Sequence, residues 1–239
     1  MQYHGTDKLL INMTQEIKEE AIEQLEKDIL FGFENGDDLF ESISEMFYDE
    51  DDFDENWLKN EIKIRLKKHQ AESLNWEKPT DFEKLVKSFD ELNKEKIVSL
   101  HRAGYTRQDG ESDCSEIIEE LKTIGITAKG YCFYHTQDLE RAIGDEKMLY
   151  IGFDSYNRED DLAKEVAEKI VGILKKNGFN VNWNGSLESR IEILNINWKK
   201  AVDNVDYNYS RVFEIMEKYN TIEKPEIKER NKIPFWKFW

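Results

Sequence analysis

Near residue 96 the spacing of apolar residues along this chain changes from a helical pattern to an alternating one. Before that point apolar residues recur every three or four positions, as in Ile17, Ala21, Leu25 and Ile29. After it, short runs rich in β-branched and aromatic residues alternate with helical segments, which is typical of α/β domains. The sequence therefore predicts an α/β fold, a mixed β-sheet flanked by helices, with an N-terminal α-helical part.

This change of pattern divides the chain into three regions. They are an acidic helical region (residues 1–95), an α/β domain (residues 96–220) and a charged and aromatic C-terminal tail (residues 221–239). Apolar spacing predicts four amphipathic helices in the first region, near residues 14–30, 38–47, 57–69 and 80–92. Thr80 and Glu83 have the spacing of a capping box, which marks the start of the fourth helix. We expect the four helices to share one core.

The α/β domain is predicted to have the element order β-α-β-α-β-α-β-β. In chain order we expect a strand at residues 96–101, a helix at 112–125, a strand at 126–134, a short helix ending at 144, a strand at 148–153, a helix at 162–176 and a hairpin of residues 179–183 and 190–198. Asn184 and Gly185 suit the turn of that hairpin. Because helical crossovers favour parallel pairing, we expect the earlier strands to be parallel and the last one antiparallel, with a terminal helix near residues 205–219.

The net charge of −17 is concentrated in the helical region, where 26 acids face 12 Lys and Arg. Residues 28–58 hold twelve acids and no Lys or Arg, and residues 49–55 read DEDDFDE. The candidate binding residues in this segment are Asp49, Glu50, Asp51, Asp52, Asp54 and Glu55. A negative field attracts basic proteins and repels nucleic acid and anionic membranes, so we expect a basic protein partner, although solubility alone also explains the charge. Calcium binding is the weaker reading, because the glycine and terminal glutamate of an EF-hand loop are missing.

The sequence favours a cytoplasmic protein. Cys114 and Cys132 are the only cysteines, and they form neither a metal-ligand pair nor a disulfide framework by spacing. The first twelve residues lack a basic segment followed by an apolar run, and no segment approaches the about 20 apolar residues of a membrane span.

Polar side chains gather where the first two predicted strands end. His101 ends the first strand, and His135, Gln137, Asp138 and Glu140 follow the second. Residues at the carboxyl ends of strands face the crevice where open α/β sheets bind ligands, so His101, His135, Asp138 and Glu140 are candidate metal ligands or acid–base groups. The connecting loop adds Tyr105, Asp109 and Asp113. The alternative is structural: His135 and Asp138 cap a helix, and His101 bonds within a loop.

No motif of a known catalytic or phosphate-binding class supports the enzymatic hypothesis, and the sequence leaves the cofactor unknown. The predicted hairpin adds two further candidate binding residues, Trp183 and Arg190. Arg190 either binds a carboxylate on a ligand or pairs with an acid of this chain.

Three segments resemble an uncharacterised bacterial family, a domain of unknown function. They read LHRAGYTRQDG, GYCFYHTQDLERAI and NWNGSLESRIEI, and the resemblance covers residues 100–198 without the acidic helices. It implies no activity, but it draws attention to seven residues: His101, Tyr105, His135, Gln137, Asp138, Trp183 and Arg190.

Three hypotheses follow from these observations. The first is an acidic protein-binding module, such as an immunity protein that neutralises a basic bacterial toxin. The second is an enzyme or small-ligand binder that uses the His/Asp cluster around a metal or in an acid–base step. The third is an adaptor whose Phe235, Trp236, Phe238 and Trp239 dock into a partner or into its own core.

Overall fold

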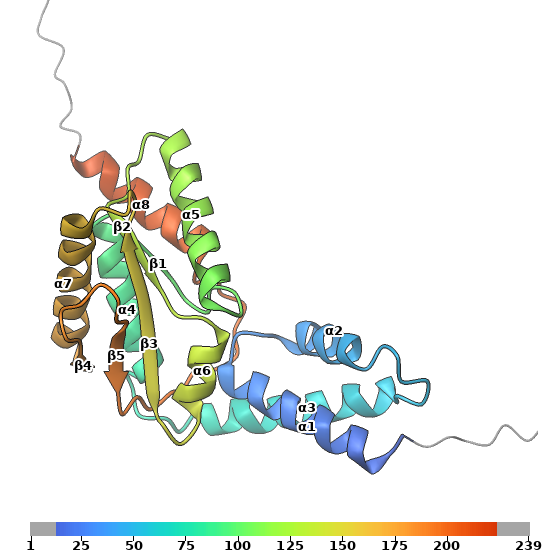
Figure 1. Ribbon diagram of the computed structural model, residues 1–239. Coiled ribbons are helices and arrows are strands. Elements are labelled where there is room, and N and C mark those ends of the chain that lie inside the picture. Colours follow the sequence, from blue (N-terminus) through green and yellow to red (C-terminus); the bar gives the residue numbers. More distant parts are fainter. Residues whose placement is uncertain (1–12, 224–239) are drawn as a thin grey trace, which may run out of the picture.

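A computed structural model describes residues 13–223, and it confirms a mixed α/β fold with an N-terminal helical part (Figure 1). The helices are α1 (Gln15–Phe31), α2 (Gly36–Met46), α3 (Glu55–Ser73), α4 (Asp81–Lys94), α5 (Arg107–Thr123), α6 (Thr136–Ile143), α7 (Asp160–Lys176) and α8 (Tyr209–Glu223). The strands are β1 (Ile97–Leu100), β2 (Gly130–Phe133), β3 (Met148–Ser155), β4 (Asn180–Asn182) and β5 (Ile191–Leu194). The four aromatic tail residues named above lie outside the described residues.

Helices α1, α2 and α3 form an arm that projects from the side of the sheet (Figure 1). The side chain of Thr14 caps α1, which ends at Gly32 in the left-handed conformation that a glycine adopts most easily. The arm has an apolar core of its own, made of Ala21, Leu25, Ile29, Leu39, Ile43, Phe47, Leu58 and Ile62. The three helices of the arm are therefore held together by the apolar contacts that they make with one another.

The expectation that α4 shares this core is wrong. The predicted capping box of Thr80 and Glu83 is present, but α4 packs against β1, α7 and α8. Its buried residues Leu85, Phe89 and Leu92 belong to the core beneath the sheet. Only two residues separate α4 from β1, so the chain turns back at once and lays the apolar face of the helix on the strand.

The arm and the sheet are joined by buried polar contacts. The Nζ of Lys200, a residue only 2% exposed, donates a hydrogen bond of 2.7 Å to the carbonyl of Gly32 at the end of α1. His69 of α3 contacts the carbonyl of Lys200 at 3.0 Å, and Arg102 pairs with Glu34 at 2.7 Å. These contacts fix the arm on the rest of the molecule.

The five strands form one sheet in the order β1-β2-β3-β5-β4. β1 and β2 are parallel and β4 and β5 antiparallel, as predicted. The prediction of a parallel third strand is wrong, because β3 runs antiparallel to β2. α6 has only eight residues and covers about 12 Å at 1.5 Å per residue. After this short connection β3 pairs back along β2, with Gly130 opposite Ser155 and Phe133 opposite Gly152.

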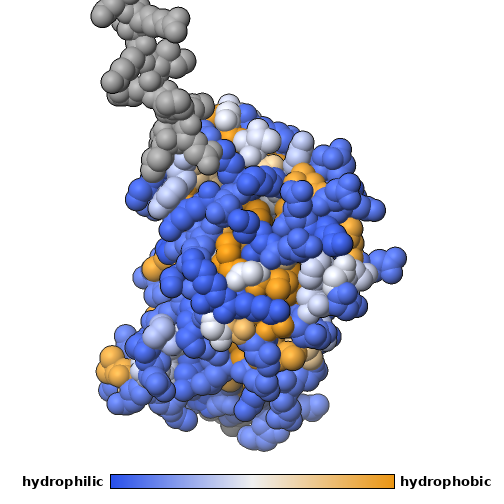
Figure 2. Space-filling view, turned by 90° about the vertical axis from the view of Figure 1, so that its left-hand side faces the viewer, coloured by the Kyte–Doolittle hydropathy of each residue, from blue (hydrophilic) through white to orange (hydrophobic). Residues whose placement is uncertain are grey.

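Helices cover the two faces of the sheet unequally. α4 and α7 cover one face, and α5 and α8 cover the part of the other face formed by β1 and β2. The side that carries α7 and β4 is mostly hydrophilic, with apolar side chains visible near its middle (Figure 2). None of the described helices is both long and apolar enough to cross a membrane.

Two predicted helix starts are corrected by the structure. α5 begins at Arg107, five residues before the expected Ser112, because Thr106 and Asp109 form a capping box. Asp109 and Asp113 therefore lie in α5 and not in a loop. α8 begins at Tyr209, later than predicted.

Candidate functional site

The loops that follow β1 and β2 lie side by side at the carboxyl ends of these parallel strands. The register places Leu100 opposite Phe133, and backbone pairing continues beyond it. Ala103 donates to the carbonyl of Tyr134 at 2.9 Å, and Thr136 donates to the carbonyl of Gly104 at 3.2 Å. The two predicted clusters, around His101 and around His135, are therefore neighbours in the backbone.

The side chain of His101 belongs to the core. It is 1% exposed, and its Nδ1 lies 3.0 Å from the hydroxyl of Tyr134. Its ring contacts four aromatic side chains, Phe82, Phe89, Tyr134 and Tyr207. The amide of Asn208 bonds to both the N–H and the C=O of His101, each at 2.7 Å. Burial, assisted by the charge of Arg211, holds the pKa of His101 well below its usual value, so its imidazole is neutral.

His135 forms a second, separate cluster with Asp138 and Arg190. The Oδ2 of Asp138 accepts a hydrogen bond from the backbone N–H of His135 at 3.2 Å, which caps α6, and lies 3.1 Å from the Nε2 of the same residue. The Nη1 of Arg190 donates to Oδ1 of Asp138 at 2.8 Å. The guanidinium of Arg190 also lies over the ring of Tyr150, 4.2 Å from its centre. Asp138 is 1% exposed, so a buried carboxylate connects α6 to the loop before β5.

The protonation state of His135 follows from these contacts. Burial lowers the pKa of His135 below its usual value, the carboxylate of Asp138 opposes this shift, and Arg190 adds to it. The carboxylate of Asp138, 3.1 Å from Nε2 of His135, favours a proton on that nitrogen, whereas Nη1 of Arg190, a donor 3.4 Å from the same nitrogen, opposes it. With the proton on Nε2, the Nδ1 atom of His135 is an acceptor, and it is buried without a hydrogen-bond partner among the described residues.

The two histidines do not combine into one site. His101 contacts aromatic rings and His135 contacts an ion pair, and no hydrogen bond or ion pair joins them. Residues 13–223 contain no group of three or more His, Cys, Asp or Glu side chains that could hold a metal ion.

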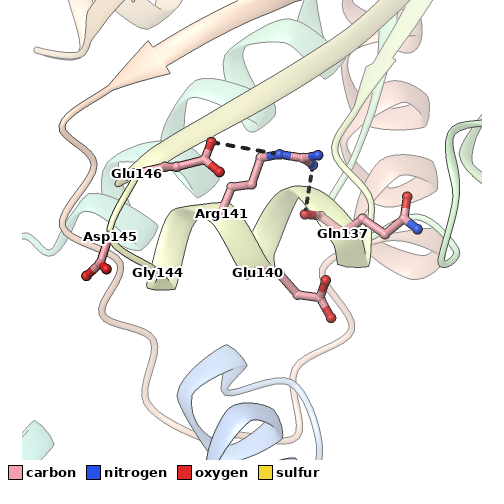
Figure 3. A pocket seen from close by; sticks show the side chains of 6 residues that line it. All are labelled: Gln137, Glu140, Arg141, Gly144, Asp145 and Glu146. Atoms are coloured by element: carbon pink, nitrogen blue, oxygen red, sulfur yellow. Dashed lines mark hydrogen bonds and ion pairs between the residues drawn. The ribbon is translucent and has the colours of Figure 1, made fainter.

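Gln137 and Glu140 lie on the outer side of α6, beside an open cavity of about 450 Å³ (Figure 3). Arg141 extends across the helix between the carbonyl of Gln137 at 3.2 Å and the carboxylate of Glu146 at 3.9 Å. Glu140 points away from these residues in Figure 3 and pairs with Lys27 of α1 at 3.3 Å. The cavity is lined by three carboxylates and one guanidinium, and two of these carboxylates, Glu140 and Glu146, already pair with Lys27 and Arg141.

The remaining predicted residues are placed apart. Tyr105 is 56% exposed in the loop before α5. The indole N–H of Trp183 donates to the carbonyl of Ser186 at 3.1 Å, and its ring packs edge-on against Phe153. Trp183 therefore anchors the loop between β4 and β5. Tyr150 was not among the predicted site residues. It alternates with the apolar residues of β3, which places it on the opposite face of the strand.

The acidic segment lies at the outer end of the arm, between α2 and α3. Of its six acids only Asp52 is half-buried, and Asp54 caps α3 by accepting bonds from Asn56 and Trp57. We define the acidic tip as Glu41, Glu45 and residues 49–55. A cavity of about 460 Å³ opens here. It is lined by Glu41, Ser44, Glu45, Phe47, Tyr48, Glu50, Phe53 and Glu55.

Most carboxylates of the acidic tip make no ion pair with a cation of residues 13–223, and two large apolar side chains beside the tip are exposed. Within the described part of the chain, Glu55 is the one glutamate of this cavity that makes an ion pair, with Lys59 at 3.6 Å. Tyr48 is 85% exposed and Met46 is 51% exposed beside these carboxylates. An aromatic ring and a flexible thioether are thus presented to solvent on an anionic surface.

Comparison with known proteins identifies a family for this chain. A family model described as "Domain of unknown function (DUF6891)" matches residues 14–202. The match covers the helical arm as well as the sheet, so it extends further than the resemblance seen over residues 100–198. No curated protein and no solved structure matches the chain.

Proposed function

The chain belongs to the family described as "Domain of unknown function (DUF6891)", and we propose that it is a binding protein whose acidic tip docks a basic protein partner. Because the tip is negatively charged, the partner is a basic protein. We propose a basic bacterial toxin as this partner, which makes the chain an immunity protein that neutralises it. The proposal places the protein in the cytoplasm, and the free, buried thiols of Cys114 and Cys132 support a reducing compartment.

The observation that carries this proposal is the cavity at the acidic tip. Glu41, Glu45 and Glu50 share it without a cation from the described residues. Several carboxylates on one surface without cations of their own create a negative field, which attracts a basic partner. Tyr48 adds an exposed ring of the type that is enriched at binding hot spots. Charge then steers the partner, and the aromatic ring contributes buried contact area.

A charge reversal tests the proposal. Glu45→Lys combined with Glu50→Lys changes two carboxylates of the acidic tip, and the matched control combines Glu165→Lys with Glu168→Lys on the exposed face of α7. Binding of purified basic toxin domains is measured by biolayer interferometry at low and high salt. We expect salt-sensitive binding that the tip variant loses and the control retains.

Two results of this experiment would contradict the proposal. A toxin domain that binds the wild-type chain and the tip variant equally well would remove the acidic tip from the proposal. Binding that is independent of salt would contradict the electrostatic mechanism.

A second function, ligand binding or acid–base chemistry at the sheet end, is supported by one observation, the bare Nδ1 of His135. An imidazole held by a carboxylate through its other nitrogen is arranged to accept a proton. NMR of the ring nitrogens tests this directly. A proton on Nε2 retains the candidate base, whereas a proton on Nδ1 excludes it.

A further inference from the structure

The last sixteen residues of the sequence are rich in basic and aromatic side chains, whereas the acidic tip is rich in carboxylates. Residues 224–239 hold five basic side chains, Lys224, Lys228, Arg230, Lys232 and Lys237. They hold two acids, Glu226 and Glu229, and end in the four aromatic residues Phe235, Trp236, Phe238 and Trp239. This segment is cationic and aromatic, and it lies outside the described residues.

The acidic tip offers complementary groups to such a segment. Its cavity presents glutamates that no cation of residues 13–223 neutralises, apart from the pair of Glu55 with Lys59. Phe53 lies within the cavity and Tyr48 stands exposed beside it. Lysine and arginine bind both to carboxylates and over aromatic rings, and aromatic side chains pack on exposed rings.

We infer that residues 224–239 of a second copy of this chain bind the acidic tip. The described chain ends at Glu223 in α8, and α8 and the loop between α2 and α3 lie at opposite ends of the molecule (Figure 1). To reach the acidic tip of its own chain, the segment would have to extend across the whole molecule. The acidic tip of a second copy can be reached without this. A contact between two different surfaces is heterologous, so copies associate head to tail.

This inference rests on the proposed function, because it gives the same acidic tip a second occupant. The C-terminal segment competes with a basic partner for the tip, and the partner displaces it. Self-association then keeps the anionic surface covered until a partner of higher affinity is present. Both contacts weaken as salt rises, since charges carry them.

Sedimentation equilibrium of the full chain tests the inference. We expect an average mass that rises above the 28.4 kDa of one chain as concentration increases. An excess of a synthetic peptide of residues 224–239 should return it to that value. A control peptide with all four aromatic residues replaced by alanine should compete less well. Peptide affinity is measured in parallel by fluorescence anisotropy.

Matched variants locate the contact. Glu45→Lys with Glu50→Lys should weaken peptide binding by at least about tenfold, because two attractive charges become repulsive. Glu165→Lys with Glu168→Lys on α7 should leave it unchanged. The inference is overturned if the peptide does not bind, or if it binds both double variants equally. It is also overturned if the peptide binds but the full chain keeps the mass of one copy, because each chain then covers its own tip.

The same measurements separate this inference from the proposed function. A basic toxin domain that binds the acidic tip when the peptide does not leaves the proposed function standing and removes the inference. Peptide binding at the tip without binding of any basic protein supports the inference and counts against the proposed function.

Discussion

The buried ion pair of Asp138 and Arg190 makes a quantitative prediction about Asp138→Asn. The carboxylate is 1% exposed and receives Arg190 at 2.8 Å and the backbone N–H of His135 at 3.2 Å. The amide keeps the shape but removes the charge, and it turns one acceptor into a donor that faces other donors. Breaking a buried pair costs about 3–5 kcal/mol, and the side chain of Arg190 is 26% exposed, so water offsets part of the loss.

We therefore expect the free energy of unfolding to fall by about 3 kcal/mol, near the lower end of that range. For a chain of this length such a loss corresponds to a decrease of about 6–12 °C in Tm. Urea unfolding followed by circular dichroism at neutral pH measures the free energy. Glu140→Gln is the matched control, because Glu140 lies two residues further along α6 in a half-exposed pair with Lys27, and its loss should cost less than about 1 kcal/mol.

A double-mutant cycle with Arg190→Met isolates the pair. If Asp138 and Arg190 stabilise the fold through each other, the double variant loses less than the sum of the two single losses, by about 1–3 kcal/mol. Strict additivity would refute the reasoning, as would an Asp138→Asn variant no less stable than the Glu140→Gln control. The first result would mean that each side chain acts through other contacts.

Three further predictions use other parts of the structure. Gly110→Ala places a methyl group 2.3 Å from the ring of Phe133 and should destabilise the chain by about 1–3 kcal/mol, whereas Gly172→Ala has open space and should stabilise it by about 0.4–1 kcal/mol. Equal urea midpoints for these two variants would contradict this. The pKa of His101 is lowered by folding, so the unfolded chain binds its proton first and stability falls as pH decreases below about 6.5. His101→Phe should flatten that slope in denaturant titrations at several pH values, and an unchanged slope would show that other groups cause it. Lys200→Met removes the hydrogen bond to the carbonyl of Gly32 at the end of α1, so backbone amides of α1 should exchange with solvent faster. Exchange at the wild-type rate would mean that this hydrogen bond does not hold the arm.

The local elements of the fold follow from the sequence, because the signals that encode them are local. Thr14 caps α1, and Thr80 with Glu83 opens α4 where their spacing predicted. The order of helices and strands also follows from hydrophobic periods. The same kind of signal, Thr106 three residues before Asp109, marks the start of α5, so this helix start is also encoded locally.

At the candidate site, the sequence predicted that the two histidines follow the first two strands, and the structure shows these strands to be parallel neighbours. It did not separate their environments. His101 packs among rings from α4 and the segment before α8, and His135 meets Arg190, which lies 55 positions away. Which of the many acids pairs with Arg190 depends on how the β4–β5 loop folds over α6.

The sequence by itself determined the order of the helices and strands, the caps that start α1 and α4, which faces are apolar, and where negative charge is concentrated, because these depend on neighbours within a few residues. The tertiary structure alone decided that α4 leaves the arm for the sheet, that β3 turns antiparallel, and that Asp138 joins Arg190. These outcomes depend on which apolar faces and charges meet across long separations. Many arrangements satisfy the same local pattern, and the packing of the whole chain selects among them.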